Sequence, residues 1–270
     1  MTEGRLAGKT ALVTGSTRGL GRTAADWLAK EGANIVVSGR EPADVDSAVQ
    51  ALAAYGVETT GIAADLSIAE EAHRLGDAAI ERVGAIDLLI NNAGMSIRKS
   101  FWEYTDADWD YQMTVNVRSP FILAQRFAKH FIEREVPGRI VNVSTIGVAA
   151  CHADAAIYNI AKAGVEAMTR NMAFELGPYG ISVNCVAPGN MAERPGAEPA
   201  AWWGPAARQI PFGRVGNGDD IAAAVLFFCL PESEFTTGQT LLVDGGHNTY
   251  LAGVWPEPYR PQDSPDSARG

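Results

Sequence analysis

The chain of 270 residues has few of the residues that build disulfide frameworks and metal sites, with three cysteines and four histidines. Cys151, Cys185 and Cys229 are far apart, and three thiols cannot all pair, so we expect free thiols in a reducing compartment. The histidines show no metal-ligand spacing, and the sequence therefore predicts no metal site.

Long hydrophobic runs and clusters of positive charge are missing as well. The longest uninterrupted apolar stretch, Ile221–Leu230, is about half of the roughly 20 residues that cross a bilayer, and no signal-peptide pattern is present. The 22 Lys and Arg are outnumbered by 32 Asp and Glu, which gives a net charge of −10. Nucleic acids and anionic membranes attract clustered positive charge. We therefore expect a cytoplasmic protein that binds neither nucleic acid nor membrane.

Short runs rich in β-branched residues alternate with longer amphipathic stretches along the chain. This alternation predicts βαβ units, and the continuous apolar character of most short runs indicates a sheet covered by helices on both faces. The expected fold is a single α/β domain over residues 1–246, a doubly wound parallel sheet of about seven strands. Its ligand would bind beyond the carboxyl ends of the strands, where strand order reverses. Strands are expected at 10–14, 34–38, 58–63, 86–91, 139–144, 181–186 and 240–243, and helices near 19–31, 43–55, 68–83, 107–134, 155–177 and 219–230.

Two segments lack this pattern. Residues 188–212 contain several prolines and glycines and the pair Trp202–Trp203, so we expect a loop that caps the ligand crevice. Residues 247–270 contain four prolines and no helical periodicity. We expect a C-terminal tail outside the core fold, either docked on a neighbouring subunit or disordered.

The first expected strand runs directly into the glycine-rich turn TGSTRGLG at residues 14–21, and a helix follows. Gly15 permits a tight turn, Gly19 lets the backbone approach a pyrophosphate, and Gly21 allows close packing of helix on strand. The helix N-terminus adds free N–H groups and the positive end of a dipole. The turn therefore predicts a dinucleotide site.

Further motifs follow in order: NNAG at residues 91–94, Ser144 after the fifth expected strand, and YNIAK at residues 158–162. With the GxxxGxG turn they resemble the short-chain dehydrogenase/reductase family, over residues 6 to about 246. The resemblance implies a Rossmann-type domain, a nicotinamide cofactor, and oxidation of an alcohol or reduction of a carbonyl. The residues it implies for the cofactor are Gly15, Thr17, Arg18, Gly19, Leu20, Gly21, Arg40, Asp65, Leu66, Asn92, Gly94, Tyr158, Lys162, Pro188 and Gly189.

The end of the second expected strand indicates which nicotinamide cofactor is preferred. Enzymes that prefer NAD place an acidic residue there, which binds the ribose 2′-hydroxyl and repels a 2′-phosphate. This chain has Gly39 there with Arg40 beside it, and Arg18 can approach the same ribose from the glycine turn. Two guanidinium groups suit a phosphate, since each charge-assisted contact contributes roughly 1.5–3 kcal/mol. We expect NADPH to be preferred over NADH.

Tyr158 and Lys162 share one face of a predicted helix, about one turn apart. A neighbouring ammonium favours the phenolate, so Tyr158 can exchange a proton with the substrate oxygen while hydride moves to or from the nicotinamide. By resemblance, Ser144 would hydrogen-bond that oxygen, Lys162 would also hold the nicotinamide ribose, and the backbone carbonyl of Asn116 would position a water in a proton relay.

Two features depart from the family pattern. The step from Ser144 to Tyr158 is one residue longer than the commoner step of 13, so we expect one extra residue in the intervening loop. Glu193 stands where a threonine usually binds the nicotinamide carboxamide, five residues after Pro188. Either nearby backbone replaces that contact or the loop follows another path.

The expected substrate is a small or medium metabolite such as a polyol, a sugar acid or a cyclic ketone. Arg98 and Lys99 favour an acidic group, whereas the paired tryptophans favour a ring. Two alternatives stay open: a reductase of 3-oxoacyl thioesters on an acidic carrier protein, and a nucleotide-sensing protein without turnover. Small residues on the Tyr158 helix permit close helix approach, and the family resemblance implies that such helices pair between subunits in a homo-tetramer or dimer. The residues expected to contact substrate are Ser144, Met95, His152, Tyr158, Asn190 and Trp202.

Overall fold

The computed structural model describes residues 4–192 and 203–249, and its core is one seven-stranded parallel sheet in the order β3-β2-β1-β4-β5-β6-β7. The order reverses between β1 and β4, as in a doubly wound fold. The predicted fold class is confirmed. The strands are β1 (Thr10–Thr14), β2 (Asn34–Gly39), β3 (Thr59–Ala63), β4 (Leu88–Asn91), β5 (Arg139–Val143), β6 (Ser182–Pro188) and β7 (Thr240–Val243).

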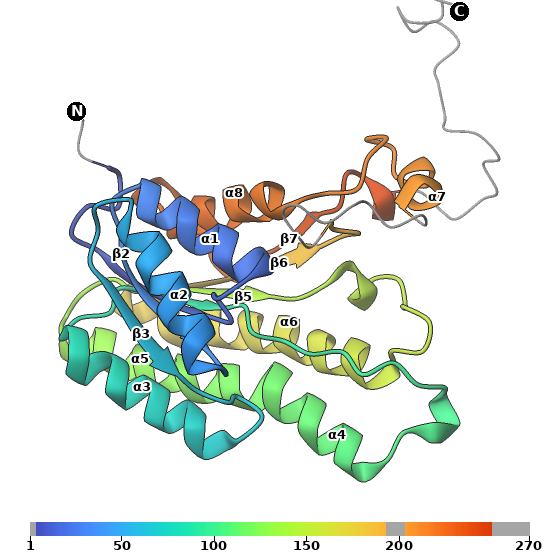
Figure 1. The fold of residues 1–270 in the computed structure, drawn as a ribbon, viewed down its shortest axis with the longest axis horizontal. Helices are drawn as coiled ribbons and strands as arrows, with labels where there is room; N and C mark the ends of the chain where they lie inside the picture. Colours follow the sequence, from blue (N-terminus) through green and yellow to red (C-terminus); the bar gives the residue numbers. More distant parts are fainter. Residues whose placement is uncertain (1–3, 193–202, 250–270) are drawn as a thin grey trace, which may run out of the picture.

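Two helical layers cover the sheet (Figure 1). One apolar cluster joins the sheet to α1 (Gly19–Lys30), α2 (Pro42–Ala53) and α8 (Gly218–Cys229). A second joins the opposite face to α3 (Ala69–Val83) and α5 (Ser119–Glu133). The strands β1, β5 and β6 are buried along their whole length because helices cover both faces of the sheet. β5 and β6 are therefore mainly apolar, although each also buries polar side chains.

The helix expected at 107–134 is divided into three parts: α4 (Asp106–Met113), a π-helical turn (Thr114–Arg118) and α5. Pro120 gives a physical reason, because it has no N–H to donate to the carbonyl of Asn116 in an α-helical bond. Asn116 therefore lies in a π turn, a feature frequent at functional sites.

The long helix α6 (Ala156–Leu176) follows β5 and begins shortly before Tyr158. The segment expected as a capping loop contains the short helix α7 (Trp203–Arg208), and residues 193–202, including Glu193 and Trp202, lie outside the described part. Of the predicted tail, only the 3₁₀ turn His247–Thr249 is described. Short 3₁₀ turns at Phe101–Glu103, Ile146–Val148, Gly177–Tyr179 and Pro231–Ser233 complete the described elements. Within these residues no helix is long and apolar enough to cross a membrane.

Candidate active site

The glycine turn between β1 and α1 has the backbone that its sequence predicts. Gly15 and Gly19 have φ of +63° and +58°, in the left-handed region that favours glycine. A Cβ at Gly21 would collide with Asn92 Nδ2 and the carbonyl of Gly15. Asn92 Nδ2 in turn donates to the carbonyls of Thr14 at 2.9 Å and Gly15 at 3.2 Å. Asn92, the second asparagine of the NNAG motif, thus holds the turn in place, and only a glycine at position 21 leaves room for its side chain.

A cavity of about 600 Å³ opens at the carboxyl ends of β1, β2 and β4. It begins at the N-terminus of α1, whose first turn carries no acidic residue, so nothing there opposes an anion. Eleven residues predicted from the sequence line the cavity: Gly15, Thr17, Arg18, Gly19, Leu20, Gly21, Arg40, Asp65, Leu66, Asn92 and Gly94. The sequence analysis missed Ser38, Ala64, Ser67, Ala93, Tyr111 and Val115 as lining residues, and placed Met95 with the substrate only.

The end of β2 has no space for a side chain. A Cβ at Gly39 would lie 2.5 Å from Thr17 Cγ2, so an acidic residue there would require Thr17 to move. Arg18 and Arg40 both line the cavity and both are exposed. Neither guanidinium forms a hydrogen bond or ion pair within residues 4–192 and 203–249, so both can reach a ligand.

Lys162 is buried in α6, with 3% of its surface exposed. Its Nζ donates to the carbonyl of Val143 at 2.8 Å and lies 5.8 Å from the centre of the Tyr158 ring. Burial lowers the pKa of Lys162 to about 8, because desolvation disfavours the ammonium. The tyrosine and lysine predicted as a catalytic pair therefore lie side by side.

Asn116 meets this pair from the π turn. Its Oδ1 accepts from the N–H of Met95 at 3.1 Å and its Nδ2 donates to the carbonyl of Met95 at 2.8 Å. A Cβ at Gly94 would lie 3.0 Å from Asn116 Oδ1 and 3.2 Å from Lys162 Nζ. Gly94, Asn116 and Lys162 thus converge at one point beside the cofactor cavity.

Ser144 does not have the geometry expected from the sequence. Its hydroxyl is buried and faces α6, where it lies 2.9 Å from Glu166 Oε1 and 3.3 Å from the carbonyl of Lys162. A hydroxyl with one proton directed at these acceptors has none for a substrate oxygen. In this structure the Ser144 side chain therefore ties the end of β5 to α6, which argues against the role of substrate donor predicted for it.

Thr145 is the neighbouring hydroxyl that sequence reasoning missed. Its Oγ1 accepts from the N–H of Gly147 at 3.3 Å, and its own proton has no acceptor in the part of the chain that the structure describes. Counted from Thr145, the step to Tyr158 is the 13 residues commoner in the family. The apparent extra residue was therefore the signal that could have located Thr145, and the loop needs no insertion.

The residues predicted to contact substrate are placed only in part. Met95 lines the cofactor cavity, and Asn190 lies beyond the end of β6, where its carbonyl accepts from Gly216. His152 is half-buried, and its ring packs on Gly147. Its pKa is lowered mainly by desolvation and secondly by the positive charge of Arg98. Pro188 is the last residue of β6 and pairs with Val243 of β7, and the N–H of Gly189, which follows, donates to the carbonyl of Val243.

Comparison with known proteins places these features in one family. The sequence pattern described as enoyl-(acyl carrier protein) reductase matches residues 15–248. The gluconate 5-dehydrogenase of Gluconobacter oxydans (strain 621H) is 38% identical over 247 residues, which cover 89% of this chain and 95% of that protein. The chain belongs to the short-chain dehydrogenase/reductase family. Members of this family are oxidoreductases that act on CH–OH groups.

Two further short-chain dehydrogenase/reductase relatives show the range of the similarity. The gluconate 5-dehydrogenase of Burkholderia cenocepacia J2315, solved with NADP and tartrate, has a TM-score of 0.85 and 33% identity, covering 92% of this chain and 98% of that one. The 3-oxoacyl-[acyl-carrier-protein] reductase of Aquifex aeolicus (strain VF5) is 33% identical, covering 90% of this chain and 98% of that protein.

Proposed function

We propose that the chain is an NADPH-preferring oxidoreductase that interconverts a carbonyl and a secondary alcohol on a small polar metabolite such as a polyol or sugar acid. The observation that carries the cofactor preference is the end of β2, where Gly39 packs on Thr17 and two arginines, Arg18 and Arg40, line the cavity without a side-chain partner among the described residues. A 2′-phosphate would be bound there by charge-assisted hydrogen bonds. The relative solved with NADP supports the assignment.

The residues of this chain divide the chemistry among them. A bound nicotinamide would supply or accept the hydride at the substrate carbon. Tyr158 exchanges a proton with the substrate oxygen, and Lys162 favours the ionised tyrosine by its charge and holds the ribose. Thr145 takes the role first expected of Ser144 and donates to the same oxygen, stabilising its developing charge. Asn116 holds Met95 and the π turn beside Lys162.

The acyl-carrier alternative is supported by the Aquifex aeolicus relative and by the description of the matching family pattern. It requires a basic surface for an acidic carrier, and the four cations that could form one, Arg98, Lys99, Lys129 and Arg134, each contact other groups of the chain. Arg98 donates to the carbonyl of Ala153 at 3.3 Å. Lys99 pairs with Asp108 at 2.7 Å, and Lys129 lies 3.7 Å from Glu133. Arg134 donates to the carbonyl of Ile86 at 2.8 Å. These contacts and the net charge of −10 favour the small metabolite.

Assembly with a second copy of the chain is part of the proposal. A groove of about 500 Å³ runs between α6 and the segment from the end of α4 through the π turn to the start of α5, and its apolar residues include the half-exposed Phe121. Covering such a groove removes apolar surface from water, which favours a homo-dimer or tetramer. The groove is lined by Met113, Val117, Arg118, Phe121, Met168, Asn171, Met172 and Glu175.

The experiment that tests this function follows nicotinamide absorbance with NADPH and NADH side by side, on ketones, keto-sugar acids and 3-oxoacyl thioesters. Turnover that favours NADPH and disappears in Tyr158→Phe would support the proposal. Arg40→Ala should raise KM for NADPH about tenfold and leave KM for NADH unchanged, because only the phosphate contact is lost. Arg170→Ala, an exposed arginine on α6, is the matched control. A preference for NADH, or tight binding of NADPH without turnover, would contradict the proposed function.

A further inference from the structure

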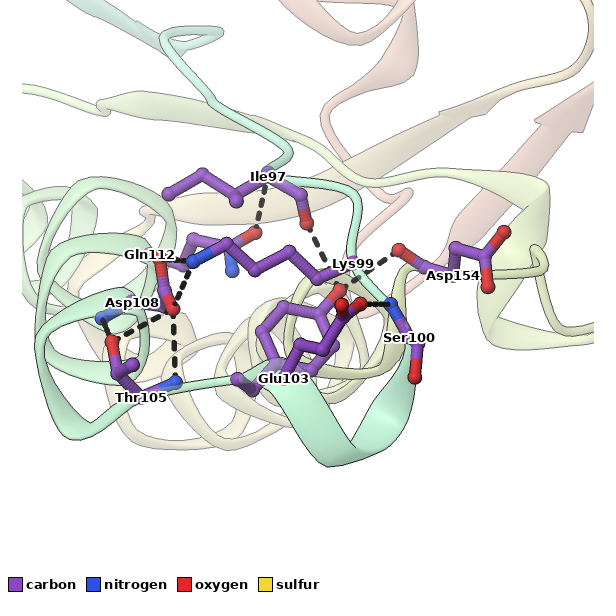
Figure 2. Close-up of polar contacts among 9 residues, drawn as sticks. Ile97, Lys99, Ser100, Glu103, Thr105, Asp108, Gln112 and Asp154 are labelled. Atoms are coloured by element: carbon purple, nitrogen blue, oxygen red, sulfur yellow. Dashed lines mark hydrogen bonds and ion pairs between the residues drawn. The ribbon is translucent and has the colours of Figure 1, made fainter.

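The segment that follows β4, residues 95–105, lies against the loop of residues 149–155 that leads into α6. Figure 2 shows Ile97 and Lys99 of this segment and Asp154 of the loop within one network of polar contacts. Lys99 donates its backbone N–H to the carbonyl of Asp154 at 3.0 Å, and Arg98 Nη1 donates to the carbonyl of Ala153 at 3.3 Å. Two chain segments about 50 residues apart are thus joined beside the catalytic pair.

Tyr104 joins the two segments through its hydroxyl. Its Oη lies 2.9 Å from the carbonyl of Ile97 and 2.8 Å from the carbonyl of Asp154. A phenol has one proton, so it donates to one of these carbonyls at a time and remains close to the other. The contact therefore needs a hydroxyl at this position, and phenylalanine would remove it while keeping the ring.

The segment on the Tyr104 side is anchored independently of the loop. The N–H of Ile97 donates to Gln112 Oε1 at 2.9 Å, and Lys99 Nζ lies 2.7 Å from Asp108 Oδ2 (Figure 2). Thr105 caps α4 and also donates to Asp108. The hydrogen bond from Lys99 is the largest cause, ahead of those from Thr105, that lowers the pKa of Asp108 to about 2. The ion pair therefore persists at neutral pH. The segment 95–105 is fixed to α4 and provides a firm support.

The loop on the other side is strained at the residue that the hydroxyl contacts. Asp154 has φ of +55°, a left-handed conformation that costs a non-glycine residue roughly 1 kcal/mol or more. Ala155 is the N-cap residue of α6, and Tyr158 lies in the first turn of that helix. Helix ends fray unless other contacts hold them. The donors on the Asp154 carbonyl therefore hold the turn that presents the tyrosine.

We propose that Tyr104 is a positioning residue: its hydroxyl clips the loop before α6 to the segment after β4, and so fixes Tyr158 relative to Lys162 and the substrate oxygen. The proposal rests on the function proposed above, in which Tyr158 transfers the proton. Displacement of a reacting group by about 1 Å can cost up to about a hundredfold in rate.

The kinetic test compares Tyr104→Phe with the wild type and with Tyr179→Phe, which removes a hydroxyl from an exposed tyrosine after α6. In Tyr104→Phe we expect kcat to fall about tenfold, while KM for the carbonyl substrate and the Kd and stoichiometry of NADPH stay within about twofold. The solvent deuterium isotope effect on kcat should increase, because proton transfer becomes slower. Loss of folded enzyme alone would leave that isotope effect unchanged.

A second measurement does not depend on turnover. Hydrogen exchange at the amides of Lys99 and Asn159, which donate to the carbonyls of Asp154 and Ala155, should accelerate at least about fivefold in Tyr104→Phe and stay unchanged in Tyr179→Phe. If the wild type turns over no substrate, the function proposed above fails, and exchange alone decides whether the clip exists. Unchanged exchange overturns the clip, and faster exchange with unchanged kcat overturns its positioning role.

Discussion

The hydroxyl of Ser144 lies 2.9 Å from Glu166 Oε1, on the side of β5 that faces α6. Glu166 follows Lys162 by one helical turn, so the contact fixes the end of β5 to the part of α6 that carries the buried lysine. Ser144 thereby joins the strand and the helix that form the site. In the function proposed above, the adjacent Thr145 donates its proton to the substrate oxygen.

This difference predicts opposite results for the two hydroxyls. Thr145→Ala should lower kcat about a hundredfold, as expected when one donor to a developing oxyanion is lost, and Thr145→Ser should restore most of it. Ser144→Ala should keep kcat within about threefold and lower stability by about 1 kcal/mol, because Glu166 loses a buried donor. Steady-state kinetics and thermal unfolding of the three variants check both statements. A greater loss of kcat in Ser144→Ala than in Thr145→Ala would reverse the assignment.

The sequence predicted the sheet well because the order of a doubly wound fold follows from alternating strands and helices. β1 and β7 have the expected bounds, and the other strands differ by at most two residues at each end. The interruption of the helix expected at 107–134 was missed, although Pro120 was its signal. The periodicity of apolar residues predicts where a helix lies, but it does not reveal that one backbone N–H is missing within it.

The parts of the site that the sequence did not reveal depend on contacts between distant segments. Nothing in the local sequence around Tyr104 or Asp154 indicates that they are in contact. The contact arises because two loops pack together beyond the carboxyl ends of β4 and β5. The choice between the two hydroxyls at the end of β5 was open to error for a different reason. Successive side chains point to opposite sides of an extended strand, so an error of one residue exchanges Ser144 for Thr145.

The close approach of Gly21 and Asn92 predicts a strong effect of one methyl group. In Gly21→Ala, the added Cβ would collide with the amide of Asn92 and with the carbonyl of Gly15, which is backbone and cannot move alone. We expect Kd for NADPH to rise at least about tenfold. Gly177→Ala is the matched control, since a Cβ there meets nothing within 4 Å and φ is −54°. Equal Kd values for the two variants in a fluorescence titration would contradict the role of this contact.

The groove beside α6, which Phe121 lines, predicts how assembly responds to charge. Phe121→Glu places a carboxylate in an apolar groove, which a second copy would have to desolvate, so we expect the oligomer to dissociate into smaller species. Tyr55→Glu changes a comparably exposed aromatic residue after α2, on the opposite face of the sheet, and should leave the mass unchanged. Sedimentation velocity measures both. An unchanged oligomer in Phe121→Glu would show that this face is not the interface.

The buried ammonium of Lys162 predicts a pH-dependent stability. Its pKa is lowered to about 8 in the folded chain, so between pH 8 and about 10.4 the unfolded state holds a proton that the folded state has lost, and the free energy of unfolding rises with pH. Below pH 8 Lys162 is charged in the folded state, and burying its ammonium lowers the free energy of unfolding by on the order of 3 kcal/mol. The hydrogen bond to the carbonyl of Val143 offsets part of this loss. Without cofactor, Lys162→Met should therefore have the higher Tm at pH 7, and its advantage should shrink towards pH 10. Lys129→Met, at an exposed site, should show no such trend. A difference in Tm that is constant with pH would mean that Lys162 is not buried in its charged form.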